Sequence, residues 1–135
     1  MTARGIARAV LLSPVVARPG HWLATLLAFL WGCLLLGHLQ HRRGLWYFQG
    51  LPAWAFGRGG TTIGAIYLTR ANTGDGVLDH EAVHVRQWRR YGLAFIPLYL
   101  AAGRDALHNR FEIEAGLERG GYLPRHDRPG GASTS

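Results

Sequence analysis

His80-Glu81-Ala82-Val83-His84 is the stretch from which the rest of the chain is interpreted, because it lies inside a run, Val77 to Tyr91, that reads as one helix. Residues four apart on a helix lie on the same face, one turn apart, so both imidazoles can reach a single ion while Glu81 flanks them. This is the geometry of a zinc site. The competing interpretation is a chance meeting of two histidines and a glutamate in a chain that holds seven histidines.

The composition describes a small, basic chain. Its 135 residues predict one domain, and its 15 basic residues, all arginine, exceed the eight acidic ones to give a net charge of +7. Without lysine, the protein cannot use a Schiff base or a lysine general base. Strong basicity favours a nucleic acid or an anionic membrane surface as a partner. The arginines are scattered, with no long basic tract and no recognisable nucleic-acid module, so we expect no specific nucleic acid.

Cys33 is the only cysteine in the chain. One cysteine excludes an intramolecular disulfide and a zinc knuckle built on cysteines. Because Cys33 lies in an apolar run, we interpret it as a small buried or lipid-facing residue.

Residues 1–43 are predicted to form an N-terminal membrane segment. The run Trp22 to Gly37 has no charge, and with its flanks it just reaches the roughly 17 to 20 residues that a spanning helix needs. A transmembrane or membrane-associated helix with membrane lipids as partners follows, and a buried soluble helix is the alternative. Pro14 and Pro19 argue against a long continuous helix upstream of this run. Arginines are balanced on its two sides, so the sequence leaves the sidedness open.

Residues 44–119 are predicted to form a compact α+β domain. Leu45 to Leu51 is aromatic and strand-like, and Thr61 to Thr69 is the best strand candidate, so a small β-sheet is expected. Asp75 or Asp79 is expected to cap the motif helix, and Gly92 stands where that helix should stop.

Two shorter helices are expected after the motif helix. One begins near Pro97, within an uncharged run. The other begins after Asn109, a good N-cap with Glu112 at the capping-box position three residues on. From Gly120 the composition turns to glycine, proline and polar residues, so residues 120–135 are predicted to be a disordered tail.

A third metal ligand is needed, because a catalytic zinc site uses three protein ligands and leaves a fourth position for water. Seven downstream residues carry an acidic or imidazole group: Asp105, His108, Glu112, Glu114, Glu118, His126 and Asp127. The last two lie in the predicted tail and are set aside. Glu112 and Glu114 are two apart, about 200° around a helix, so only one of them can face the metal. Glu112 also fits the capping box without any metal.

Three stretches together carry a resemblance to known proteins. They are His80-Glu81-Ala82-Val83-His84-Val85-Arg86-Gln87, the apolar Phe95 to Leu100, and Asn109-Arg110-Phe111-Glu112-Ile113-Glu114-Ala115. They resemble a family of small, uncharacterised bacterial membrane-associated proteins that carry HExVHxRQ followed by NxFExEA. More broadly, the pattern is similar to gluzincin-type zinc metallopeptidases, in which a glutamate on a second helix completes the HExxH site. The match covers Leu45 to about Tyr122.

The resemblance implies a zincin-like domain and a specific chemistry. His80, His84 and Glu112 would hold Zn²⁺, and Glu81 would be the general base in peptide-bond hydrolysis. The chain is then expected to be a membrane-anchored zinc-dependent metallopeptidase that acts on a peptide or protein. The first alternative is a non-catalytic zinc-binding membrane protein of the same fold. The second is a basic membrane-binding or nucleic-acid-binding protein in which HExxH is accidental.

Gly116 departs from the gluzincin pattern. Membrane metallopeptidases of that kind often have an aspartate four residues beyond the ligand glutamate, and each ligand histidine normally needs such a partner. Gln87 lies on the metal face of its helix and can supply that support, or it can simply solvate the helix end. The supporting groups and alternative ligands left open are Glu114, Gln87, Asp105 and His108. The donors to a substrate oxyanion left open are Tyr91, Tyr99, Tyr122 and His108.

Overall fold

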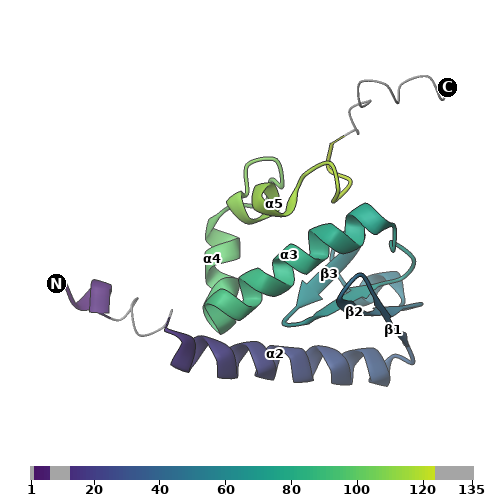
Figure 1. Cartoon of the computed structure of the whole chain (residues 1–135), viewed down its shortest axis with the longest axis horizontal. Coiled ribbons are helices and arrows are strands. Elements are labelled where there is room, and N and C mark those ends of the chain that lie inside the picture. Colours follow the sequence, from purple (N-terminus) through teal and green to yellow (C-terminus); the bar gives the residue numbers. More distant parts are fainter. Residues whose placement is uncertain (1, 7–12, 124–135) are drawn as a thin grey trace.

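The computed structural model describes residues 2–6 and 13–123, and its architecture is α+β, as the sequence predicts. A four-stranded sheet is covered by one long helix on each face (Figure 1). The elements are α2 (Pro14–Leu34), β1 (His38–Arg42), β2 (Leu45–Gln49), η1 (Ala53–Ala55), β3 (Gly60–Ile63), β4 (Ile66–Thr69), α3 (Asp75–Tyr91), η2 (Gly92–Ala94), α4 (Phe95–Ala101) and α5 (Arg110–Ala115).

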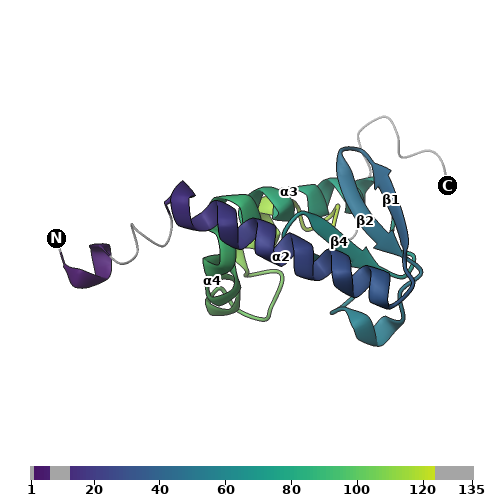
Figure 2. The ribbon, with the colours of Figure 1, turned by 90° about the horizontal axis from the view of Figure 1, so that it is seen from below.

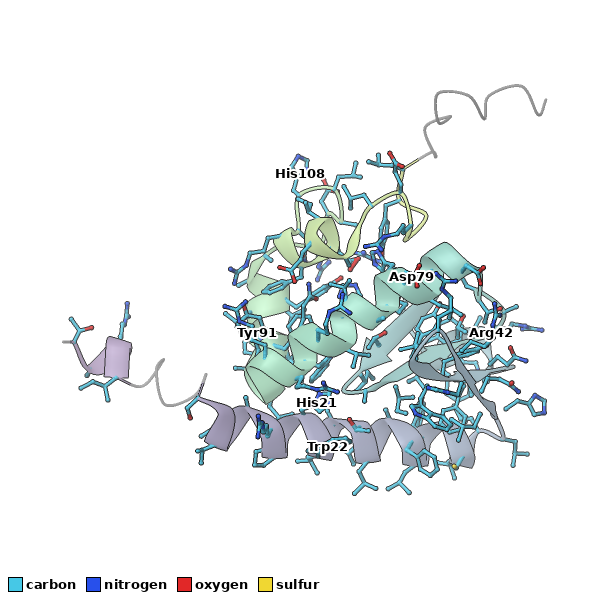
Figure 3. All side chains as sticks on the ribbon, in the orientation of Figure 1. His21, Trp22, Arg42, Asp79, Tyr91 and His108 are labelled. Carbon is cyan, nitrogen blue, oxygen red and sulfur yellow. The ribbon has the colours of Figure 1, made fainter. Side chains whose placement is uncertain are left out.

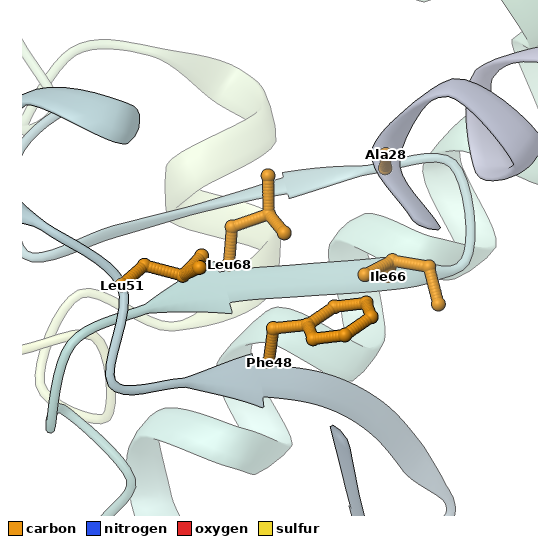
Figure 4. Packing of buried hydrophobic residues seen from close by; sticks show 5 residues of the cluster. All are labelled: Ala28, Phe48, Leu51, Ile66 and Leu68. Carbon is orange, nitrogen blue, oxygen red and sulfur yellow. The ribbon is translucent and has the colours of Figure 1, made fainter. Parts of the chain in front are cut away.

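The sheet has the strand order β1-β2-β4-β3. β2 pairs in parallel with β4, while the β1/β2 and β3/β4 pairs are antiparallel. Side chains alternate along β4, so Ile66 and Leu68 pack with Ala28 of α2 (Figure 4), while Tyr67 packs with Leu78 of α3 on the other face. The central strand is therefore buried on both faces, and β3 lies at the edge of the sheet beside α3.

The predicted strand Thr61 to Thr69 is wrong in one respect, because the structure divides it into β3 and β4. The two strands join through Gly64 and Ala65, and Gly64 has a φ of 63°, which a glycine adopts without a steric penalty. Thr25 Oγ1 of α2 accepts a hydrogen bond from the Ala65 N–H at 2.9 Å. The segment is thus a tight hairpin held against α2.

The predicted strand Leu45 to Leu51 is confirmed as β2, but its partner β1 was not predicted. All five residues of β1 are exposed, so the segment lacks the alternation that marks a half-buried strand. Leu45 pairs with Arg42 across the connection between the strands. The predicted domain boundary between residues 43 and 44 therefore falls inside a β-hairpin.

α2 begins earlier than predicted. Pro14 stands at the start of the helix, where its missing N–H costs nothing, and Pro19 is accommodated inside it. Ala17, Ala24 and Ala28 are buried against the fold, and a Cβ on Gly32 would collide with the Phe48 ring. Within the described part of the chain, no helix is both long enough and apolar enough to cross a membrane.

The motif helix is confirmed as α3, although its start differs from the prediction. Its N-cap is Gly74, and the carboxylates of Asp75 and Asp79 instead bind Arg42 and Arg43 of the β1 hairpin at 2.8 Å. Gly92 ends the helix with a φ of 59°, as expected for a C-terminal glycine.

α5 starts as the sequence predicts. The Asn109 side chain accepts hydrogen bonds from the backbone N–H groups of Phe111 and Glu112, and it donates to the carbonyls of Tyr99 and Gly103. A short helix of this length depends on such caps and contacts rather than on its own propensity. The cap therefore fixes where Glu112 leaves the backbone.

Candidate metal centre

α3 and α5 bring three buried ligand groups together. His80 and His84 lie one turn apart on α3, and α5, which packs beside α3, supplies Glu112. His84 Nε2 lies 2.5 Å from Glu112 Oε1 and 3.1 Å from His80 Nε2, while His80 Nε2 lies 3.6 Å from Glu112 Oε1. The three side chains are almost fully buried and can hold a metal ion.

Both imidazoles are oriented by an acceptor at the other ring nitrogen. His84 Nδ1 lies 2.7 Å from the side-chain oxygen of Gln87, and His80 Nδ1 lies 2.7 Å from the carbonyl oxygen of Gly116. An Nδ1–H that donates to these oxygens leaves both Nε2 lone pairs directed at the shared centre, which is the tautomer that a metal needs.

Gly116 supports His80 through its backbone carbonyl. The sequence pattern lacks the acidic residue expected there, and the structure places a backbone carbonyl against His80 instead. A carbonyl oxygen is a recognised partner for a ligand histidine. No side-chain signal in the sequence could have shown it, because every residue except proline carries the same N–H and C=O groups.

Gln87 supports the centre and does not solvate the helix end. Its side chain is 3% exposed, and its amide nitrogen donates to the Phe111 carbonyl at 3.0 Å and to Glu114 Oε1 at 3.1 Å. One side chain of α3 therefore holds His84 and α5 together. Glu114 is exposed and accepts from Gln87, so of the two glutamates only Glu112 belongs to the group with the histidines.

The burial of these side chains and their contacts with one another shift the pKa values of Glu112 and His84. Burial by itself would raise the pKa of Glu112, but its contacts with the His80 and His84 imidazoles outweigh burial and hold the pKa well below its usual range. For His84, burial would lower the pKa, whereas the Glu112 and Glu81 carboxylates raise it above its ordinary value. Glu112 is therefore ionised, and it is the anionic member of the group, available to bind a cation.

Glu81 lies beside the group and faces a cleft. Its Oε2 accepts a hydrogen bond from Thr62 Oγ1 of β3 at 2.7 Å, and burial raises the pKa of its carboxyl. The cleft has a volume of about 290 Å³. Its lining combines Glu81, His84 and Glu112 with β3 and with the apolar side chains of Trp88, Phe95, Ile96, Tyr99 and Leu100.

Arg58 and Tyr122 also line the cleft, and no pattern in the sequence singles out Arg58. The guanidinium donates to the Tyr122 hydroxyl at 3.1 Å and to the Arg104 carbonyl at 2.5 Å, and it lies 3.9 Å from Glu112 Oε2. Its backbone φ of 54° is uncommon for a residue other than glycine. Burial raises the pKa of Tyr122 to about 12, so its hydroxyl remains protonated at neutral pH.

The loop after α5 also packs on the centre. The Tyr122 ring lies 5.9 Å from the His80 ring, and a Cβ on Gly120 would lie 2.6 Å from His80 Nδ1. The predicted tail boundary at residue 120 therefore cuts through a loop that covers His80. The remaining tail residues, 124–135, including His126 and Asp127, lie outside the described residues.

Other predicted residues lie elsewhere. His108 Nδ1 lies 2.6 Å from Asp105 Oδ2 in an exposed pair, and neither residue joins the buried group. Of the tyrosines, Tyr99 and Tyr122 line the cleft, whereas Tyr91 stacks on Phe95 at the end of α3.

No known family model, curated protein or solved structure matches this chain. The function is therefore inferred from the residues of the centre and their geometry.

Proposed function

We propose that this protein is a zinc-dependent peptidase whose metal is held by His80, His84 and Glu112. The observation that carries the proposal is the buried group of two imidazoles and one carboxylate at a cleft, with Glu81 beside it. Such a ligand set, with a position left for water, is the arrangement of catalytic zinc in several hydrolases.

Zinc fits the residues present. The donor atoms are two neutral nitrogens and one oxygen, which suit a borderline cation rather than calcium or magnesium. Their separations, from 2.5 to 3.6 Å, lie around the roughly 3.3 Å between donors of a tetrahedral zinc ion. The Gly116 carbonyl and the Gln87 side chain contact Nδ1 of His80 and His84, and such contacts orient histidines that bind zinc.

Zinc bound there supplies a Lewis acid that polarises a peptide carbonyl and acidifies water. Glu81 takes a proton from the attacking water as the oxygen bonds to the carbonyl carbon, and it delivers that proton to the amine nitrogen as the C–N bond breaks. Tyr122 lines the cleft and accepts a hydrogen bond from Arg58 at 3.1 Å, so its own hydroxyl proton goes either to Glu112 or to the carbonyl oxygen of a bound peptide.

The cleft favours an extended peptide with an apolar side chain. β3 lies at the edge of the sheet and lines the cleft, so an extended peptide can lie along it, although the Thr62 carbonyl already accepts from the Trp88 indole at 2.9 Å. Trp88, Phe95 and Leu100 then form an apolar wall for one bulky side chain. The proposed substrate class is therefore a peptide or unstructured protein segment that carries a large apolar residue beside the cleaved bond.

The cleft size favours a second candidate, a zinc-binding protein without catalysis. At about 290 Å³ the cleft lies at the lower limit of ligand pockets, which run from roughly 300 to 1,000 Å³. In that case the metal would join α3 to α5 for stability or for peptide binding. Glu81 would then have no chemical role.

Hydrolysis of a fluorogenic peptide library by wild type and Glu81→Gln separates the two candidates. The peptidase predicts cleavage beside bulky apolar residues and a loss of at least about 100-fold in Glu81→Gln, with zinc content unchanged. Tyr122→Phe should retain zinc and lose about tenfold or more in kcat. Equal activity in wild type and Glu81→Gln, or zinc-loaded protein that cleaves no peptide, contradicts the peptidase.

A further inference from the structure

The outward face of α2 is apolar along its whole length. Figure 3 shows side chains projecting from α2 on the side away from the rest of the fold, and Figure 2, seen from below, shows the helix in front of the other elements. Large apolar residues with exposed fractions from 39% to 82% make up this face: Val15, Val16, Trp22, Leu23, Leu26, Leu27, Phe29, Leu30 and Leu34. Exposed apolar surface of this extent on one face marks a site of interaction.

The packing of α2 is the reverse of that in an ordinary surface helix. Its small residues Ala17, Ala24, Ala28 and Gly32 are turned toward the fold, and most of its bulky residues are turned outward, Trp31 excepted. The hydrophobic effect of folding alone would place leucine and tryptophan inside. A further apolar environment therefore accounts for the outward residues.

We infer that the outward face of α2 binds an anionic membrane, with the helix lying in the plane of the membrane surface. α2 contacts α3, η2, β3 and β4, so its inner face is occupied by the fold. Only the outer half of the helix can enter the boundary between headgroups and acyl chains, to a depth of about 5 to 10 Å.

Charge and polarity favour lipid over a second copy of the chain. A protein interface typically carries about one hydrogen bond per 100–200 Å², whereas the exposed large side chains of α2 are apolar, with Arg18 as its one charged residue. Two copies with a net charge of +7 each repel one another, but the same charge attracts an anionic lipid surface. Arg18 lies one turn before Trp22, where arginine and tryptophan suit the headgroup level.

Vesicle flotation of the full chain tests the inference. We expect the protein to float with vesicles of phosphatidylcholine and phosphatidylglycerol, and less with phosphatidylcholine alone. Leu26→Glu together with Leu30→Glu should reduce the partition coefficient more than about tenfold. Leu107→Glu with Ile113→Glu is the matched control, since it adds the same charge at exposed apolar residues outside α2 and should change binding less than threefold.

The unfolding midpoint verifies that each variant is folded, and the flotation result depends neither on zinc binding nor on peptidase activity. The inference is overturned if both double variants bind alike. It is also overturned if the wild type fails to float and instead forms a dimer in solution that Leu26→Glu with Leu30→Glu dissociates.

Cys33 allows the orientation of the helix to be measured. It is the only cysteine and is exposed on α2, so a nitroxide can be attached to it directly. A second label goes on Val15→Cys in a Cys33→Ser background, 18 residues away and about 27 Å along the helix. An in-plane helix gives both labels the same depth within about 5 Å, whereas depths that differ by 15 Å or more contradict the in-plane geometry.

Discussion

Gln87 is the residue on which the orientation of His84 depends. It accepts from His84 Nδ1 and donates to two groups of α5, so it determines both the tautomer of the histidine and the position of Glu112. His80 obtains the same support from the Gly116 carbonyl. The centre is therefore supported by one side chain that can be altered and one backbone group that cannot.

Gln87→Leu should weaken zinc binding by about 10 to 100-fold, because the partner of a ligand histidine contributes that much to metal affinity. Competition with a fluorescent zinc chelator measures the effect. Gln40→Leu, at an exposed position in β1, serves as the control and should leave the affinity unchanged. An affinity that is equal in both variants would show that Gln87 does not orient a ligand.

His21 is a buried histidine whose environment opposes its charge. Its side chain is 1% exposed between α2 and α3 (Figure 3), and neither ring nitrogen has a hydrogen-bond partner among the described residues. Burial, and secondarily the charge of Arg89, lower its pKa below the ordinary 6.5. The folded protein therefore binds fewer protons at His21 than the unfolded chain does at acidic pH.

The free energy of unfolding should consequently fall as the pH drops below about 6.5, where His21 of the unfolded chain takes up a proton. In His21→Leu this pH dependence is removed. The loss of an unpaired buried polar group should also raise the free energy of unfolding by about 1 kcal/mol at pH 7.5. Urea unfolding of both proteins at pH 7.5 and pH 5.5, with the same zinc concentration, measures the difference. If the free energy of unfolding falls by the same amount from pH 7.5 to pH 5.5 in both proteins, His21 is not the group responsible.

Among the elements, α3 was predictable because a helix needs only its own sequence to set the spacing of His80 and His84. The failures have local causes. Thr61 to Thr69 was predicted as one strand because its β-branched residues conceal a turn at Gly64, and only the contact with Thr25 of α2 makes that turn evident. β1 is polar and exposed, and it is a strand because β2 pairs with it.

α5 is the element most dependent on a single residue. Asn109 caps its first turn and ties it to the end of α4. Asn109→Ala should lower the free energy of unfolding by about 1 to 2 kcal/mol and should also reduce zinc retention, because Glu112 lies in the capped turn. Denaturant unfolding and metal analysis check both effects. Asn72→Ala, at an exposed position, is the control. Normal zinc retention in Asn109→Ala would show that the cap does not position Glu112 for the metal.

At the scale of the whole molecule, the centre joins segments that are far apart in the chain. The ligands on α3 were predictable from the spacing of one motif. The third ligand depended on a resemblance, and the roles of Gly116, Arg58 and Tyr122 depend on how the loop after α5 folds back on α3. Contacts between distant segments leave little trace in one sequence.

Zinc should therefore stabilise the side of the molecule built from α5 and its following loop. Free zinc at 100 times its Kd adds about 2.7 kcal/mol to the free energy of unfolding. Chelation should increase hydrogen exchange in residues 110–123 before it affects the amides of β4, which are buried at the centre of the sheet. Mass spectrometry of peptic fragments measures this, and equal changes in both regions would contradict a local role for the metal.

The central claim is that His80, His84 and Glu112 hold one zinc ion. Its most direct test is the metal content of purified wild type, Glu112→Gln and Glu114→Gln, a matched pair because each variant removes one carboxylate charge from α5. We predict about one zinc per chain in wild type and in Glu114→Gln, and less than a tenth of that in Glu112→Gln. Metal-free wild type, or equal zinc in the two variants, would contradict the account.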